Sequence, residues 1–346
     1  MVNKQKRKVL AVVCMIVALV IVSAFAATNH QNDVSIFKDV FSKEVSSEKS
    51  ESMPEPSLTQ LSNSLTRGVK GDQSVYTSVN GIVVDGDKIF VSDETGKKIF
   101  RLSLKGEIEE TYTSAVTVNG IATDGSYIYA LTGGLDGAVV KLSKNFDILS
   151  VTKVGHTPCD IAFAKGKAYV VNRFSSDISV ISVSDMTVMS TVEADGREPI
   201  SAVAVGDNIY VACHLPDEST KESVMSANLN IISASTDKLT KTLPFVNGSS
   251  GIKDICVSPD GNTVYVSHIV GRYAYPTTQL DRAWINSNCV SIVDTKFQTI
   301  ICSVLLDEVD KGAANPWGVT VSSDGKYLCV ALSGLDEIML VDRVKM

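Results

Sequence analysis

A motif of about forty residues recurs six times along this chain of 346 residues. Each copy contains a short apolar strand, a turn built on Asp-Gly or a similar pair, and a second strand around an aromatic residue. Equivalent residues of the six copies are Ile82, Ile121, Ile161, Val203, Ile255 and Val319, separated by 39, 40, 42, 52 and 64 positions. A period near forty is typical of a β-propeller blade. The sequence therefore predicts an all-β fold, a propeller of about six four-stranded blades.

The third copy shows the expected strands most clearly, at 160–164, 168–171, 178–183 and 188–192. Five copies place an aromatic residue in the second strand: Phe90, Tyr129, Tyr169, Tyr210 and Tyr265. The sixth copy has Cys329 at this position. An aromatic side chain flanked by β-branched residues suits a strand packed between neighbouring blades. We therefore expect these residues to be structural. The recurring Asp-Gly pairs are expected in hairpin turns, where Gly adopts a positive φ.

The N-terminus is predicted to be a targeting segment, residues 1–27. Lys4, Lys6, Arg7 and Lys8 precede an apolar run that extends to Ala27. The run is long for a signal peptide and close to the length that spans a bilayer, so a cleaved signal and an uncleaved signal-anchor both remain open. In either case the positive charges stay in the cytoplasm, which predicts an extracytoplasmic body, in the periplasm or at the cell surface.

Residues 28–72 are predicted to be a polar, low-complexity stalk, because they are rich in Ser and Glu and contain Pro54 and Pro56. The propeller is expected over 73–346. Its sixth copy ends too soon for a fourth strand. Either a strand from 61–75 completes that blade and closes the ring, or the chain lacks a blade. Closure is favoured, since an open ring would leave sheet faces unburied.

The balance of charges limits the partners. The net charge is −7, whereas nucleic acids and anionic membrane surfaces require a basic surface. We therefore expect no nucleic acid. A protein or another envelope component is the expected partner, and the N-terminal segment is a possible membrane anchor.

The cysteines do not form a disulfide framework. Six of the seven lie in or beside predicted strands, where buried thiols are common. One pair depends on the register of a hairpin. A tight turn over 294–297 would set Cys289 opposite Cys302, whereas a turn two residues longer would set Cys302 opposite Ser291. Both alternatives remain open from the sequence.

Particular segments of the fifth copy resemble a known family. The sequences 256–261 (CVSPDG), 264–267 (VYVS) and 290–294 (VSIVD) are similar to the YVTN family of bacterial and archaeal surface β-propellers. The resemblance covers about 75–343 and implies a fold much more than a function. Arg272-Tyr273 with 276–282, followed by 312–318, resembles a branch associated with haem-containing peroxidase-like modules. The chain has no Cys-x-x-Cys-His segment, so it departs from a c-type haem protein, and no cofactor is expected.

Two insertions explain the longer repeats. They are predicted between the second and third strands of copies four and five, over 214–228 and 269–288, and a long connection follows at 307–315. All three are expected on one face of the propeller. Long loops on a rigid scaffold commonly bind ligands or partners.

The candidate binding residues lie on this face: His214, His268, Arg272, Tyr273, Tyr275, Asp281, Arg282, Trp284, Asn315 and Trp317. Arg, Tyr and Trp are enriched where proteins bind one another. The alternative is that the aromatic residues anchor the long loop to its own blade. Trp317 follows Pro316 at the expected mouth of the channel, where packing is the favoured role.

Catalytic and metal motifs are not evident. His156, His214 and His268 share the face with several carboxylates, but they lie on separate blades and lack ligand spacing. No nucleophile elbow, phosphate loop or dinucleotide motif occurs. We therefore expect an exported, envelope-associated propeller that binds or scaffolds through the loop-rich face. The alternatives are a metal-dependent hydrolase or lactonase at the channel mouth, and a structural surface-layer component.

Overall fold

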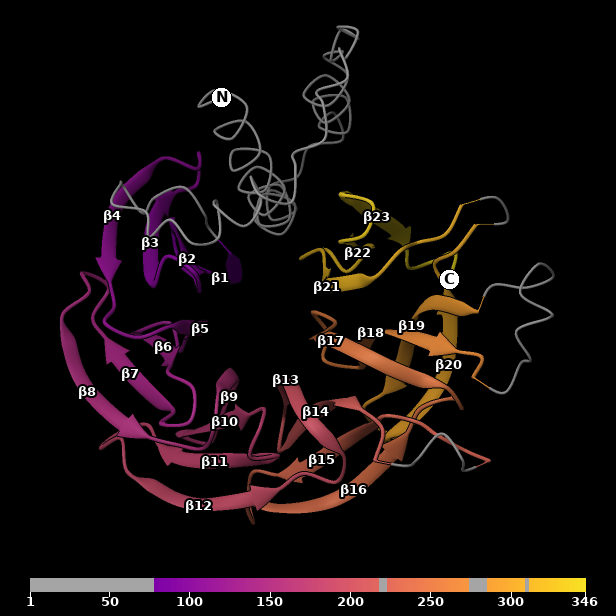
Figure 1. The fold of residues 1–346 in the computed structure, drawn as a ribbon, viewed down its shortest axis with the longest axis horizontal. Coiled ribbons are helices and arrows are strands. Elements are labelled where there is room, and N and C mark those ends of the chain that lie inside the picture. Colours follow the sequence, from indigo (N-terminus) through magenta and orange to yellow (C-terminus); the bar gives the residue numbers. More distant parts are fainter. Residues whose placement is uncertain (1–77, 218–222, 274–284, 309–310) are drawn as a thin grey trace, which may run out of the picture.

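The computed structural model describes residues 78–217, 223–273, 285–308 and 311–346. These residues form strands β1 to β23 and no helix, in six antiparallel sheets arranged around a common centre (Figure 1). In each sheet the strands follow one another in chain order, as the predicted hairpins require. The predicted all-β propeller of six blades is thus confirmed.

Each sheet forms one blade, numbered here in chain order. Blade one contains β1 (Val79–Asp85), β2 (Lys88–Asp93), β3 (Lys98–Ser103) and β4 (Ile108–Thr113). Blade two contains β5 (Val118–Thr123), β6 (Ile128–Thr132), β7 (Ala138–Leu142) and β8 (Ile148–Lys153). Blade three contains β9 (Pro158–Ala164), β10 (Lys167–Asn172), β11 (Asp177–Ser182) and β12 (Val188–Glu193).

The later blades have longer strands. Blade four contains β13 (Arg197–Val205), β14 (Asn208–Leu215), β15 (Asn228–Ser233) and β16 (Lys238–Pro244). Blade five contains β17 (Ser249–Val257), β18 (Thr263–Gly271), β19 (Asn286–Asp294) and β20 (Thr299–Leu305). Blade six has three strands in the described residues, β21 (Pro316–Val321), β22 (Tyr327–Leu332) and β23 (Glu337–Asp342).

The first strand of each blade lies innermost (Figure 1), and successive inner strands contact one another from β1 through β21. The hairpin from each inner strand to the next strand turns through a glycine in the left-handed region, and in four blades, at Gly86, Gly125, Gly261 and Gly325, an Asp precedes this glycine. A positive φ carries little steric penalty for Gly. The Asp-Gly pairs therefore have the turn role that the sequence predicts.

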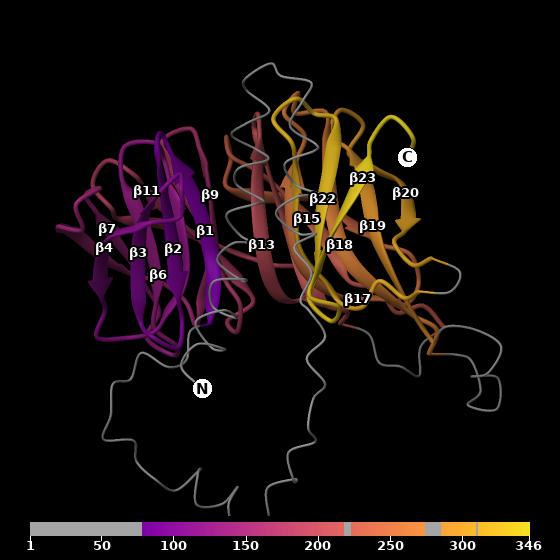
Figure 2. The same cartoon turned by 90° about the horizontal axis from the view of Figure 1, so that it is seen from above.

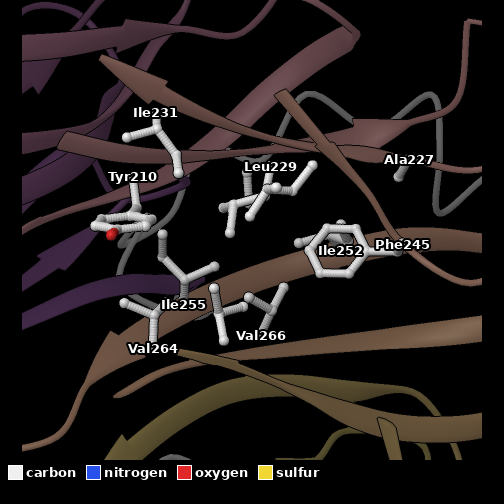
Figure 3. Packing of buried hydrophobic residues seen from close by; sticks show 12 residues of the cluster. Tyr210, Ala227, Leu229, Ile231, Phe245, Ile252, Ile255, Val264 and Val266 are labelled. Carbon is white, nitrogen blue, oxygen red and sulfur yellow. The ribbon is translucent and has the colours of Figure 1, made fainter. Parts of the chain in front are cut away.

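The aromatic residue of each second strand is buried between its own blade and the following one. Tyr210 of blade four packs with Ile255, Val264 and Val266 of blade five (Figure 3). Tyr169 likewise contacts the cluster of blade four, Tyr129 that of blade three, Phe90 that of blade two and Tyr265 that of blade six. This confirms that the aromatic positions are structural.

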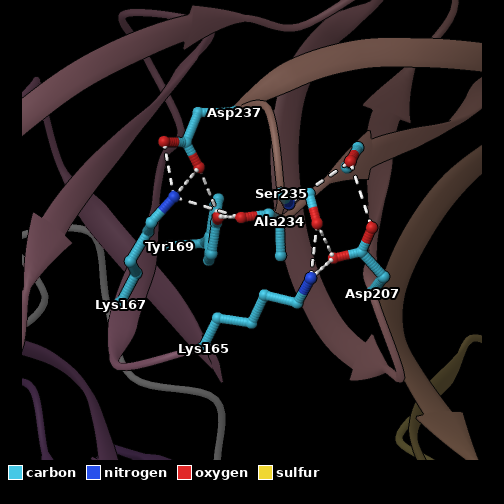
Figure 4. Close-up of polar contacts among 8 residues, drawn as sticks. Lys165, Lys167, Tyr169, Asp207, Ala234, Ser235 and Asp237 are labelled. Atoms are coloured by element: carbon cyan, nitrogen blue, oxygen red, sulfur yellow. Dashed lines mark hydrogen bonds and ion pairs between the residues drawn. The ribbon is translucent and has the colours of Figure 1, made fainter.

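Three of the tyrosine hydroxyls also bond to the following blade. Tyr169 donates to Asp237 Oδ1 at 2.5 Å, and Lys167 Nζ lies 2.7 Å from the other oxygen of the same carboxylate (Figure 4). Tyr210 donates to the carbonyl of Thr295, and Tyr265 accepts from Arg343 Nε at 2.7 Å. The polar end of each ring is therefore satisfied inside the interface, which removes the cost of burying it.

The two ends of the series of blades differ from the interior. Among the described residues, no contact comparable to those between other inner strands joins β21 to β1. The apolar cluster around Ile89 and Val91 has members from blade one alone. Blade six carries Cys329 where the other blades carry an aromatic. The strand expected from 61–75 lies outside the described residues, and ring closure through it stays a prediction.

The hairpin of β19 and β20 corrects both predicted cysteine registers. A bulge at Ile292 and Val293 sets Cys302 opposite Ile292, while Cys289 pairs with Leu305. The six cysteines of the described residues are free thiols. The predicted loop 269–288 is also shorter than expected, because β18 continues to Gly271 and β19 begins at Asn286.

The predicted signal or anchor (1–27) and stalk (28–72) lie outside the described residues. Within the described part of the chain, no helix has the length and apolar character needed to cross a bilayer.

The packing of Tyr169 gives a first prediction. Tyr169→Ala should lower the free energy of unfolding by about 3–5 kcal/mol, because it opens a cavity between blades three and four. Tyr169→Phe should cost about 1 kcal/mol, since it removes only the hydroxyl that bonds Asp237. Urea denaturation measures both.

Phe297, which is 66% exposed, provides the control. Phe297→Ala should change the free energy of unfolding by less than about 1 kcal/mol. Equal losses for Tyr169→Ala and Phe297→Ala would contradict the role of the aromatic residue between blades.

Candidate functional site

The two insertions lie on the face of the propeller where the inner strands begin, here called the loop face. The strands of the blades run between this face and the opposite one (Figure 2). The loop between β14 and β15 approaches the start of β17, since Ala227 N donates to the carbonyl of Ser249 and Gly248 N to that of Met225. The insertions of blades four and five are therefore neighbours, as the sequence predicts.

Tyr273 connects the two insertions. Its hydroxyl lies 2.8 Å from Asn247 Oδ1 and 3.2 Å from the carbonyl oxygen of Ser223. Asn247 in turn donates to that same carbonyl at 3.1 Å and accepts from Met225 N at 2.9 Å. These bonds fix the base of one loop against the other. Tyr273 thus anchors its loop to the insertion of blade four, whereas the predicted anchoring was to its own blade.

The connection from blade five to blade six is also fixed by side chains. Asp307 accepts from the backbone and side-chain amides of Asn288 at 2.7 and 2.9 Å, and from Ala313 N at 2.7 Å. Asn315 donates its backbone N–H to Asn288 Oδ1 and its side-chain amide to Ser333 Oγ at 2.7 Å. Asn315 therefore acts as a local brace between these segments.

A group of charged and aromatic residues lies at the inner edge of the loop face. Lys253 of β17 places its ammonium 4.4 Å from the centre of the Trp317 ring of β21. Trp317 is 48% exposed, so it is less packed than predicted. In blade four, the pairs Arg197–Leu215 and Pro199–Cys213 place Glu198 across from His214. Successive blades thus supply the members of this group.

Two contacts orient the charges of the group. Arg173 bonds Glu198 Oε2 through Nε at 3.0 Å and through Nη2 at 2.7 Å. His214 Nδ1 lies 2.5 Å from the carbonyl oxygen of Ile252. Because a carbonyl only accepts, Nδ1 carries the proton, and Nε2 of the neutral ring is an acceptor.

Burial and neighbouring positive charges disfavour the protonated forms of His214 and Lys253. Burial is the largest cause that lowers the pKa of His214, and the positive charges of Lys253 and Arg173 lower it further. Burial also lowers the pKa of Lys253, with Arg173 as the next cause. Perturbed groups of this kind are concentrated at functional sites.

Two carboxyl groups on the inner strands share one hydroxyl. Ser201 Oγ lies 2.8 Å from Asp160 Oδ2 and 3.1 Å from Asp254 Oδ1. Ser201 has a single proton to donate, so a proton on Asp254 satisfies the second contact. Burial is the main cause that raises the pKa of Asp160, and it raises the pKa of Asp254 to about 7. Asp254 also accepts from Val319 N at 3.0 Å, which links blades five and six.

His268 does not lie on the loop face. Because β18 continues past it, the residue is 0% exposed, with its ring centre 5.3 Å from that of Phe245. Its Nε2 shares a 2.7 Å hydrogen bond with Ser291 Oγ. Burial lowers the pKa of His268 to about 4. The ring is a neutral member of the core, which corrects its predicted place in a binding surface.

The remaining candidates are Arg272 and four further residues of the blade-five insertion. Tyr275, Asp281, Arg282 and Trp284 lie outside the described residues. Arg272 is half-buried, and its backbone N–H bonds the carbonyl of Ile285. Throughout 78–217, 223–273, 285–308 and 311–346, no three His, Cys, Asp or Glu side chains gather as metal ligands.

Lys253, Arg173 and Glu198 were not predicted from the sequence. The sequence did contain a signal for Lys253, because a charged residue occurs two positions before Ile255, the repeated apolar residue of this copy. The other copies have uncharged residues there: Asn80, Asn119, Cys159, Ser201 and Trp317. Arg173 and Glu198 lie 25 positions apart on different blades, so their pairing required the structure.

Comparison with known proteins supports the fold. No family model matches the chain. A segment of 100 residues is 26% identical to the hydrazine synthase subunit beta of Kuenenia stuttgartiensis, and the match covers 29% of this chain and 26% of that protein. The structure of Kuenenia stuttgartiensis hydrazine synthase is similar at a TM-score of 0.71 and 18% identity, covering 80% of this chain and 79% of that one. The sequence match thus spans about a quarter of that subunit, and the structural likeness shows the fold.

The pKa of Asp254 gives a pH-dependent prediction. An unfolded Asp has a pKa of about 3.9, below the folded value of about 7. The folded state therefore holds a proton that the unfolded state releases between these pH values. The stabilisation is complete below the unfolded pKa and is lost as the pH rises through about 7.

Asp254→Asn mimics the protonated acid at every pH. Relative to the parent chain, this variant should become more stable as the pH rises from about 5 to 8, by at most about 4 kcal/mol. Denaturation at a series of pH values measures the difference, with Asp136→Asn at an exposed turn as the control. A difference that does not vary with pH would contradict the assignment.

Proposed function

We propose that this chain is an exported propeller subunit that binds another protein through its loop face. The observation that carries the proposal is the fixed contact between the two insertions at Tyr273, Asn247 and Ser223. Loops tied in this way lose less conformational freedom when a partner binds, which favours association.

The apolar residues around this contact favour a protein partner. Val224, Val246 and Ile285 are 57%, 43% and 48% exposed. Val224 and Val246 are adjacent in sequence to Ser223 and Asn247, and Ile285 lies in the insertion of blade five. Apolar side chains held on a rigid surface and surrounded by polar groups are typical of protein interfaces. The exposed ring of Trp317 adds a residue type that is common in binding hot spots.

The comparisons support a role in a larger assembly. The relative with 26% local identity is by name a subunit, of hydrazine synthase. Homology to such a subunit suggests that this chain also has protein partners. Only the presence of protein partners is carried over from this relative to the present chain.

The place of action follows from the N-terminal sequence. Lys4, Lys6, Arg7 and Lys8 precede the apolar run to Ala27, and such charges favour the cytoplasmic side. We infer that the propeller works outside the cytoplasm, secreted or held at the membrane by its N-terminus.

Site-specific crosslinking tests the interface. A photoreactive amino acid placed at position 246 or 285 should give, in the native cell envelope, a covalent adduct with the same partner protein. Both positions flank the tied insertions, so a partner on the loop face would contact both.

Position 188 is the matched control, since Val188 is 46% exposed but lies on β12, the outer strand of blade three. It should give no such adduct. Adducts with that protein from position 188 alone, or equally from all three positions, would overturn the proposed interface.

A further inference from the structure

In blades one, three and four, the side chain two positions before the repeated apolar residue (Ile82, Ile161 or Val203) contacts the next blade. Asn80 donates its amide to the carbonyl of Val118 at 2.9 Å. Cys159 lies 3.4 Å from the carbonyl of Ile200 through its sulfur. Ser201 contacts Asp254 Oδ1 at 3.1 Å. In these three blades the residue at this position is uncharged and has a hydrogen-bond partner on the next blade.

Lys253 occupies the same position in blade five and differs from the others. It reaches the following blade, but it meets the face of Trp317 at 4.4 Å in place of an oxygen acceptor. Among the described residues, no carboxylate forms an ion pair with Lys253. The side chain is half-buried. An ammonium without an anion in such a setting is costly, because the aromatic face replaces only part of its hydration.

The neighbouring charges do not supply that anion. The carboxylate of Glu198 is the nearby negative charge, and Arg173 bonds it twice through Oε2. His214 donates Nδ1–H to the carbonyl of Ile252, the residue directly before Lys253, and burial, which lowers the pKa of His214, favours the neutral ring. Nε2 of this neutral ring is then a hydrogen-bond acceptor. The group therefore combines an uncompensated ammonium with a hydrogen-bond acceptor.

We propose that Lys253, beside Trp317 and His214, binds a small oxyanion, a carboxylate or phosphate group, at the inner edge of the loop face. The ammonium has three N–H donors for the oxyanion, and such charge-assisted bonds are among the stronger hydrogen bonds. Hydrogen phosphate fits both features, because its P–O–H group can donate to Nε2. The inference goes beyond the proposed function, since it requires no protein partner.

Titration with inorganic phosphate tests the site. The full chain with Trp284→Phe retains Trp317 as its single indole, because the sequence contains two Trp residues. Phosphate should change the Trp317 fluorescence in a saturable way, and calorimetry should give the same dissociation constant. Lys253→Met should weaken binding at least about tenfold, while Lys253→Arg should retain it.

Lys311→Met is the control, because the ammonium of Lys311 already pairs with the carboxylate of Glu337 at 2.6 Å. It should bind phosphate as the parent does, and a small carboxylate such as glycolate should compete in both. No saturable binding up to about 50 mM phosphate, or equal binding by Lys253→Met, would overturn the proposal.

Discussion

The insertion of one aromatic ring into the next blade is the interaction on which this fold depends. A single four-stranded sheet has two apolar faces and cannot cover either alone. Tyr129, Tyr169, Tyr210 and Tyr265 each cross from their own blade to the following one, as does Phe90. Because these side chains are large and the tyrosine hydroxyls are hydrogen-bonded, they set both the spacing and the relative orientation of the blades.

The repeat of the sequence was sufficient to predict this part of the structure. Tyr169 and its equivalents recur three or four residues after the turn glycine, so strand order, hairpins and burial all follow from a local pattern. The tied insertions were also predictable as neighbours, since extra residues in copies four and five must emerge on the same side. These predictions succeed because each depends on a short motif that recurs along the sequence.

Other features depend on contacts that the repeat does not contain. His268 was placed at a strand end, but β18 extends to Gly271 and encloses it. The bulge at Ile292 moves Cys302 away from both predicted partners. The pairing of Arg173 with Glu198 joins blades three and four through residues with no shared motif. Register shifts and pairings between blades are decided by packing, which a single sequence does not display.

The direction of the aromatic packing has a consequence for how such proteins can change in size. Blades two to five each present a ring to the following blade and receive a ring from the preceding one, so the interior interfaces are built on the same kind of contact. A duplicated blade could therefore join the series without a new kind of interface, and the two outer faces of the series would stay the same. Evolution could therefore change the number of blades, while each added blade would form the same kind of interface.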